Sequence, residues 1–157
     1  MNKEKLSRQI RNLIIFFIVV ILFFGITAFP IESEIRWIDS HSKSLPGFLA
    51  EWLHKVHVGL KETNAAFPFL AYGTDWLAFA HLIIAVLFIG PLIDPVKNKW
   101  IIDWAILCCI FVFPLALIAG PIREIPFFHQ VIDCAFGAIG IIPLMIVRKK
   151  IKQLEAL

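Results

Sequence analysis

Charged residues are scarce in this 157-residue chain, where Asp, Glu, Lys and Arg make up only 17% of the sequence. Soluble globular domains carry about 25% charged residues and show no long uninterrupted apolar stretches. Apolar residues account for 59% of this chain, and its mean hydropathy is +0.82. The composition therefore excludes an ordinary soluble domain.

Several motifs of catalysis and cofactor binding are also missing. The three cysteines, Cys108, Cys109 and Cys134, form neither C-x-x-C nor C-x-x-C-H, which removes the simplest redox and c-type haem signatures. No serine–histidine–acid order, phosphate loop or nucleotide fingerprint occurs. We expect the cysteines to lie in apolar helices as small packing residues without a disulfide.

Four long apolar runs dominate what is present. They cover residues 13–29, 76–93, 101–119 and 127–147. Each approaches the roughly 20 residues that a helix needs to cross a bilayer core, and the short alternating strands of a β-barrel are not seen. The sequence predicts an all-α integral membrane protein, a four-helix transmembrane bundle forming one membrane domain over residues 1–157. The first run follows a basic segment like that of a signal peptide, but no Ala-x-Ala site follows, so we expect a retained anchor.

Lysine and arginine predict the orientation of these helices, because cytoplasmic connections carry an excess of both. With the N-terminus inside, the inner segments hold ten of the 15 basic residues and the outer segments hold five. The inner ones are Lys3, Lys5, Arg8, Arg11, Lys97, Lys99, Arg148, Lys149, Lys150 and Lys152. Both termini are therefore expected in the cytoplasm of a bacterial inner membrane. This bias accounts for the net charge of +3, so no nucleic-acid partner is expected.

The only long connection, residues 30–75, is expected on the outer side. It begins with a polar segment, and apolar residues then recur at helical spacing from 46 to 62. They are Leu49, Trp52, Leu53, Val56 and Leu60. The pattern predicts an amphipathic helix on the outer membrane surface or capping the bundle, with Pro46 in its first turn and Thr63 and Asn64 at its end. His54 and His57 border its polar side and are expected to be solvated.

The second and third apolar runs each end in a Gly-Pro pair. These pairs are Gly90-Pro91 and Gly120-Pro121. Glycine followed by proline is typical of a helix end, so we expect both helices to stop there.

Ionisable residues gather at the expected outer ends of the helices. They are Asp75, His81, Arg123, Glu124, His129 and Asp133. His81 and Asp133 each lie six residues into an apolar run, roughly 9 Å below the outer boundary at 1.5 Å per residue. A charged Asp in hydrocarbon costs about 2.5–3.5 kcal/mol, so Asp133 needs a partner or water. We expect a polar contact between His81 and Asp133, with Arg123 or His129 nearby, in a cavity open to the outside.

Structural explanations for the same residues remain open. Asp75 or Thr74 would cap the second helix. Arg123 would pair with Glu124 or Asp133, and His81 would bond a neighbouring carbonyl. Asp103, near the inner end of the third helix, would be neutralised by Lys97, Lys99 or Arg148. His81, His129 and Asp133 are the candidates for a zinc or iron site, although no compact motif supports it.

Two functions follow from this site. The favoured one is a small membrane binding or accessory protein whose outer pocket takes a lipid head group or amphiphilic molecule, with Arg123, Trp52 and Trp76 at the interface. The alternative is a membrane-embedded, metal-dependent or metal-free hydrolase or isomerase with His81 and Asp133 as acid and base. Membrane lipids are the expected partners. The sequence leaves the cofactor, other membrane subunits and a second copy of the chain open.

Overall fold

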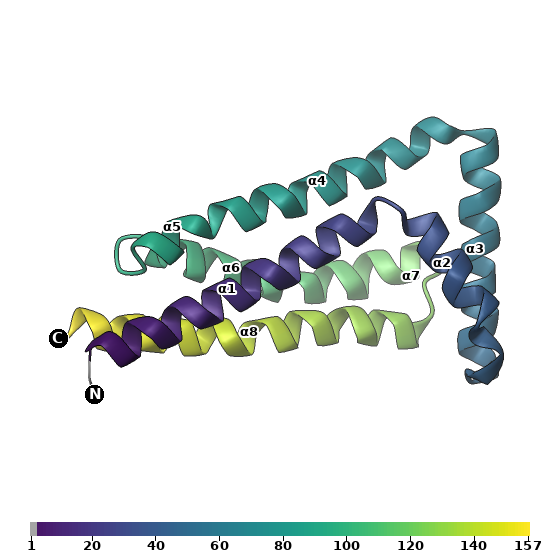
Figure 1. The fold of residues 1–157 in the computed structure, drawn as a ribbon. Coiled ribbons are helices and arrows are strands. Elements are labelled where there is room, and N and C mark those ends of the chain that lie inside the picture. The colour runs from purple at the N-terminus through teal and green to yellow at the C-terminus, as the bar shows by residue number, and fades with distance from the viewer. Residues whose placement is uncertain (1–2) are drawn as a thin grey trace. The chain divides into compact units, whose positions relative to one another are not determined.

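The computed structural model describes residues 3–157, and within that range every regular element is helical (Figure 1). The α-helices in chain order are α1 (Lys3–Ala28), α2 (Ile31–Ser40), α3 (Gly47–Ala66), α4 (Ala71–Leu87), α5 (Ile89–Ile93), α6 (Lys99–Pro114), α7 (Gly120–Ile122) and α8 (Phe127–Glu155). Short 3-10 turns occupy Ser42–Ser44 and Pro68–Leu70, and a π-helical segment occupies Leu115–Ala119.

Four stretches are long and apolar enough to cross a membrane. They are Lys3–Ala28, Pro68–Ile93, Lys99–Ile122 and Phe127–Glu155. The predicted all-α chain with four such helices is therefore confirmed, and it supports a multi-pass membrane protein. Helix α1 begins at Lys3, before the first apolar run, and helix α8 continues to Glu155, past the last one. The polar segments that flank these two runs are therefore helical as well.

The chain divides into two compact units, which are described separately. The central unit contains Ile18–Val86, and the terminal unit contains the chain up to Phe17 and from Leu87 to Leu157. The helices α1 and α4 each contribute to both.

In the terminal unit, one face of the first turns of α1 is fully packed. Leu6, Ile10 and Ile14, spaced by four residues, are at most 1% exposed, so they lie on one side of the helix. Phe88 is also completely buried, with its ring centroid 4.9 Å from that of Phe17. A hydrogen bond of 2.6 Å from Lys150 Nζ to Gln9 Oε1 holds the C-terminal part of α8 to α1.

The helices α6 and α8 of the terminal unit lie side by side and approach closely (Figure 1). A Cβ atom on Gly137 would lie only 2.8 Å from the carbonyl oxygen of Cys109, and one on Gly140 would lie 3.1 Å from its Sγ. Small residues allow such close approach between apolar helices. Cys109 thus packs as expected, and Cys108, Cys109 and Cys134 are all free thiols.

Two prolines interrupt the hydrogen-bond ladders of this helix pair. Pro114 ends α6 immediately before the π-helical segment, and Pro143 lies inside α8. Since proline has no backbone N–H, the carbonyls of Ile110 and Ile139, four residues earlier, lose their usual helical donors.

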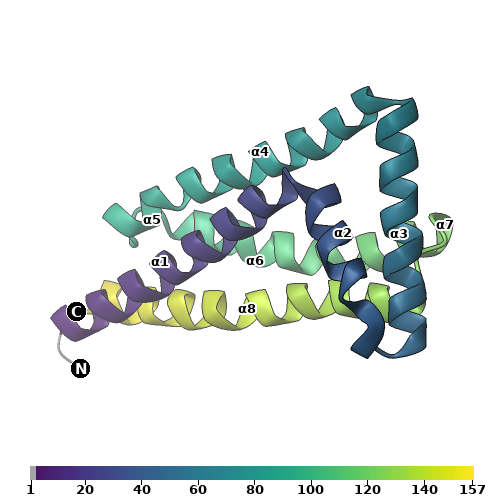
Figure 2. The ribbon, with the colours of Figure 1, turned by 45° about the vertical axis from the view of Figure 1, so that its right-hand side comes forward.

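In the central unit, α2 and α3 lie side by side, as both ribbon views show (Figure 2). The helix α2 was not predicted, because its segment was interpreted as a polar connection. Ile31, Ile35 and Ile38 nevertheless recur at helical spacing, and Glu32 and Glu34 in its first turn favour a helix N-terminus.

Helix α3 covers the predicted helix at 46–62 but continues to Ala66, so the expected end at Thr63 and Asn64 is wrong. Asn64 instead donates a 2.6 Å hydrogen bond from Nδ2 to Glu32 Oε2 on α2, and Pro68 follows the helix end. Pro46 precedes the first turn of the helix as its N-cap. Whether α3 lies on a membrane surface stays a prediction.

The second and third apolar spans end at Ile93 and Ile122, just past the Gly-Pro pairs at which we expected them to stop. Gly90-Pro91 lies inside α5, and Gly120-Pro121 begins α7. The first turn of a helix contains N–H groups without intrahelical acceptors, so proline fits there at no loss of hydrogen bonding.

Candidate functional site

The six predicted site residues fall into two groups, one in each unit. Asp75 and His81 belong to α4 in the central unit. Arg123, Glu124, His129 and Asp133 belong to the terminal unit, around the connection from α7 to α8. The contact between His81 and Asp133 stays a prediction.

His129 and Asp133 lie one turn apart on α8 and face each other. The Nε2 atom of His129 is 3.8 Å from Oδ1 of Asp133, and their side chains are 42% and 41% exposed. This separation is too long for a hydrogen bond but close enough for a charge interaction when the histidine is protonated. The predicted placement of both residues on one face is therefore confirmed.

Arg123 and Glu124 form the end of α7. Glu124 adopts a left-handed backbone conformation, with φ of 57°. The N–H of Ile125 donates to the carbonyl of Gly120 at 2.9 Å, and the N–H of Glu124 donates to that of Pro121 at 3.1 Å. This pair of bonds is the Schellman arrangement, which usually places glycine at the left-handed position.

The expected ion pair of Arg123 with Glu124 or Asp133 is absent from residues 3–157, and the Arg123 side chain is exposed. Asp133 instead lies close to His129.

A buried amide supports the same connection and was missed in the sequence. Gln130 is only 5% exposed, and its Nε2 donates a 2.7 Å hydrogen bond to the carbonyl of Ile125. A Cβ atom on Gly120 would lie 2.7 Å from the Gln130 side chain, so this glycine leaves the space that the amide fills. In the sequence, the only indication of this role was that Gln130 is a polar residue in an apolar run.

His81 forms a hydrogen bond within its own helix. Its Nδ1 lies 2.8 Å from the carbonyl oxygen of Leu77, which can only accept, so Nδ1 carries the proton. The expected bond to a neighbouring carbonyl is confirmed, and it leaves Nε2 as an acceptor in the neutral ring. On the other side, a Cβ atom on Gly25 of α1 would lie 2.9 Å from the His81 Cβ, so α1 and α4 touch closely there.

Asp75 does not cap α4, because the helix begins at Ala71 and Asp75 lies in its second turn. Thr74 is the fourth residue of the helix and does not cap it either, so the predicted caps are wrong. Both line a pocket of about 250 Å³ in the central unit. The other lining residues are Phe29, Pro30, Ile31, Glu32, Ser33, Leu60, Asn64 and Ala71.

This pocket has an acidic wall. Glu32 already accepts the hydrogen bond of Asn64, whereas the carboxylate of Asp75 makes no hydrogen bond or ion pair with another residue between 3 and 157. An unpaired carboxylate in a partly closed pocket attracts positively charged groups and hydrogen-bond donors.

A second ionisable cluster, on α2 and α3, was not predicted. Asp39 Oδ2 lies 2.8 Å from Nδ1 of His57 and 3.1 Å from Nδ1 of His54. The side chain of His54 is 68% exposed, as expected, but that of His57 is only 18% exposed, so its predicted solvation is wrong. The spacing of His54 and His57 by three residues was the only sign of this cluster in the sequence. Their partner Asp39 lies on α2, the helix that was not predicted.

The charge state of this cluster follows from its bonds. The hydrogen bond from His57 lowers the pKa of Asp39, desolvation opposes this, and the bond and charge of His54 lower the pKa further. A carboxylate only accepts hydrogen bonds, so each histidine presents a protonated Nδ1 to it.

Asp103 pairs with Arg148, whose Nε donates to the Oδ1 of the carboxylate. The expectation that a basic residue neutralises this acid is confirmed, and of the three candidates it is Arg148 that does so. Lys99 pairs with Glu155 at 2.7 Å, and Lys97 lies 3.7 Å from Asp94.

Across the described part of the chain, no three His, Cys, Asp or Glu side chains gather closely enough to hold a metal ion. The proposed metal set of His81, His129 and Asp133 draws on both units and stays a prediction. Comparison with protein-family models, curated proteins and solved structures finds no match for the chain.

Proposed function

We propose that this chain is a small integral membrane binding or accessory protein whose outward-facing polar pocket holds the head group of a lipid or another amphiphilic molecule. The observation that carries the proposal is the unpaired carboxylate of Asp75 in the pocket of the central unit. Small-molecule sites have volumes of about 300–1,000 Å³, so a pocket of about 250 Å³ suits a head group rather than a whole lipid.

The lining chemistry favours a cationic or zwitterionic head group. Asp75 and Glu32 supply two carboxylates, and Ser33, Thr74 and Asn64 supply neutral polar groups. An ammonium group would donate to Asp75, while its alkyl chain would extend along the exposed apolar surface of the unit. Trp76, next to Asp75, is 56% exposed and suits the boundary between head groups and hydrocarbon.

The proposed location is a bacterial inner membrane with both termini in the cytoplasm, supported by the ten-to-five distribution of basic residues. The pocket of the central unit would then face outward, and membrane lipids would be its natural partners.

Binding of a matched pair of amphiphiles to the purified full chain tests this function. Dodecylamine and dodecanol share an alkyl chain, but only the amine carries a positive head group. We expect the amine to bind to the wild type in maltoside detergent and raise its thermal unfolding temperature. Asp75→Asn should weaken this binding about tenfold or more, because a hydrogen bond to a charged group is lost.

Glu62→Gln is the control, since Glu62 is an exposed acid of α3 outside the pocket. It should bind the amine as the wild type does. Equal binding of dodecanol and dodecylamine, or unchanged amine binding by Asp75→Asn, would contradict the proposed pocket.

A further inference from the structure

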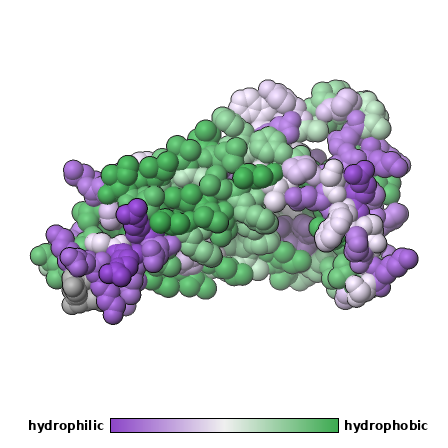
Figure 3. All heavy atoms as spheres, in the orientation of Figure 1, coloured by the Kyte–Doolittle hydropathy of each residue, from purple (hydrophilic) through white to green (hydrophobic). Residues whose placement is uncertain are grey.

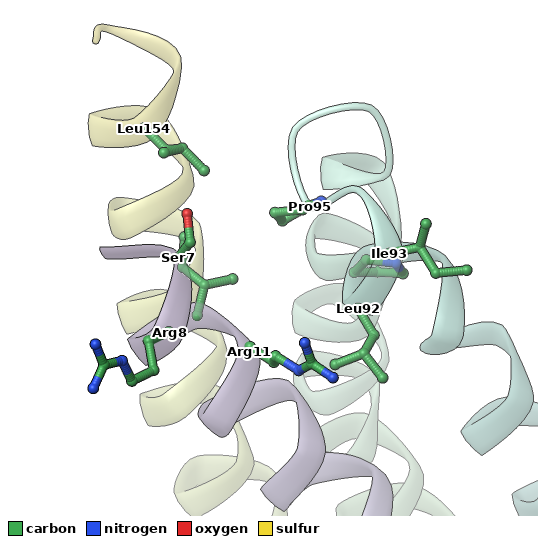
Figure 4. A pocket seen from close by; sticks show the side chains of 9 residues that line it. Ser7, Arg8, Arg11, Leu92, Ile93, Pro95 and Leu154 are labelled. Carbon is green, nitrogen blue, oxygen red and sulfur yellow. The ribbon is translucent and has the colours of Figure 1, made fainter. Parts of the chain in front are cut away.

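A second cavity lies in the terminal unit, between the first turns of α1, the segment around α5 and the end of α8 (Figure 4). Its volume is about 370 Å³, within the usual range for small-molecule sites. Ser7, Arg8 and Arg11 line it from α1. Leu92 and Pro95 line it from the segment of α5, and Leu154 lines it from α8.

The two charged residues that line this cavity are both basic. Arg8 and Arg11 lie three residues apart on α1, and neither forms an ion pair with an acid in the described chain. Figure 4 shows the Arg11 side chain reaching across toward Leu92, whereas Arg8 points away from it. Guanidinium groups without carboxylate partners are well suited to bind phosphate, since their planar fork can donate to two oxygens.

Three acids at this end of the unit are engaged by other basic residues. Glu155 pairs with Lys99, and Asp94 pairs with Lys97. Asp103 is held by Arg148. No acid lines the cavity itself, so the charged groups that an entering anion would meet on its wall are Arg8 and Arg11.

The cavity also lies where polar surface gives way to apolar surface. The apolar run of α1 begins at Leu13, two residues after Arg11. Figure 3 shows hydrophilic side chains at the end of α1 and α8 and apolar side chains along the helices beyond it. Ile93, which also lines the cavity, is 79% exposed. This sequence of a charged group followed by an apolar surface matches a phosphate followed by acyl chains.

We infer that this cavity binds an anionic phospholipid, with Arg11 on the phosphate, Arg8 adding charge at the rim, and Leu92 and Ile93 against the acyl chain. Ser7 supplies a hydroxyl beside the phosphate. Basic pockets between membrane helices are typical binding sites for anionic head groups. The site is separate from the acidic pocket of the proposed function, and its chemistry has the opposite sign.

Native mass spectrometry of the full chain, released from nanodiscs of mixed phosphatidylglycerol and phosphatidylcholine, tests the inference. We expect the wild type to retain phosphatidylglycerol in preference to phosphatidylcholine. The double variant Arg8→Gln/Arg11→Gln should lose this preference by about thirtyfold, on the basis of the usual contribution of two basic residues near a membrane surface. Arg11→Lys keeps the charge but loses the fork, so it should fall between the two.

Lys152→Gln is the matched control, because it removes one exposed positive charge from the same end of α8 outside the cavity. It should retain phosphatidylglycerol as the wild type does. The wild-type measurement needs no variant: equal retention of both lipids would overturn the inference even if the double variant failed to fold. Loss of preference in Lys152→Gln equal to that in the double variant would also overturn it.

A second arm distinguishes a lipid from free phosphate. Inorganic phosphate in excess should leave the retained phosphatidylglycerol in place, because the acyl chain contributes to binding. Complete displacement by phosphate, together with phosphate binding to the lipid-free protein, would show a site for the free anion and overturn the lipid assignment.

Discussion

The imidazole of His57 and the carboxylate of Asp39 join α2 to α3 through a 2.8 Å hydrogen bond, and both side chains are less than one-fifth exposed. The same carboxylate oxygen also accepts a hydrogen bond from Nδ1 of His54. The Asn64–Glu32 bond is a further polar link between the two helices. The ionisation of Asp39 therefore contributes two of these three hydrogen bonds between α2 and α3.

We expect the α2–α3 contact to weaken in acid. The pKa of Asp39 is lower in the folded chain than in the unfolded chain, where it is about 3.9. The ionised carboxylate therefore contributes fully to the stability of the contact above about pH 3.9. This contribution is lost as the pH falls through the lower, folded pKa. The protection factors of the α2 and α3 amides, which correct for the pH dependence of intrinsic exchange, should therefore fall below about pH 3.9. Asp39→Asn should lower them already at neutral pH, and Glu51→Gln, at an exposed acid of α3, should not. Exchange in Asp39→Asn that equals the wild type at neutral pH would contradict this role.

Glu124→Gly should stabilise the terminal unit. Glu124 holds the left-handed position of the α7 end at φ of 57°, where a side chain costs roughly 1 kcal/mol and glycine costs nothing. The expected gain is up to about 1 kcal/mol, with the loss of backbone entropy opposing it. Thermal unfolding in detergent measures the change. Glu124→Ala, which keeps the strain, should not raise the unfolding temperature.

Gly137→Ala should destabilise the contact between α6 and α8. The added Cβ would lie 2.8 Å from the backbone oxygen of Cys109, which cannot rotate away, so the helices must separate. Overpacking of this kind typically costs about 1–3 kcal/mol. Gly73→Ala in α4, whose Cβ meets nothing within 4 Å, is the control and should be neutral or slightly stabilising. Equal unfolding temperatures of the two variants would argue against the close contact.

Reporter fusions test the proposed topology. A junction after residue 40 should report an extracytoplasmic location, and a junction after residue 97 should report a cytoplasmic one, because the segments proposed to be inside hold ten of the 15 basic residues. A cytoplasmic reporter at residue 40 or an external one at residue 97 would contradict the proposed topology.

Elemental analysis of the purified chain addresses the alternative of a metal-dependent hydrolase or isomerase. On the binding function that we propose, no metal should copurify at one equivalent per chain, and Asp133→Ala should not change the metal content. A stoichiometric metal that is lost in Asp133→Ala would favour the enzyme, since Asp133 is one of its three candidate ligands.

The long helices were predictable from the sequence, whereas the short ones were not. Four apolar runs near 20 residues leave few alternatives to helices that could cross a membrane. The helix α2 has only 10 residues, so its isoleucine spacing gave a weak signal, and isolated helices of that length depend on tertiary packing for their stability. The end of α3 also lies beyond its expected stop, where the side chain of Asn64 bonds Glu32 on α2.

The candidate site was predictable only as far as residues on the same helix. His129 and Asp133 are four apart, so helix geometry places them together without further information. Asp39 and His57 are 18 residues apart on two helices, and their pairing depends on how those helices rotate and dock. Each of the two cavities likewise depends on how the helices of its own unit dock. In the sequence, Arg8 and Arg11 were interpreted only as basic residues of a cytoplasmic segment, and no local pattern indicated a cavity beside them.

Pro114 and Pro143 have a mechanical consequence for the helix pair that Gly137 and Cys109 hold together. Each proline removes one rung of the hydrogen-bond ladder, and helices bend most readily at such positions. Because α6 and α8 run in opposite directions along each other, the compliant positions lie on opposite sides of the tight crossing. In the membrane that we propose for this chain, we expect a thinner or thicker bilayer to bend each helix at its own proline, while the crossing between them keeps its spacing.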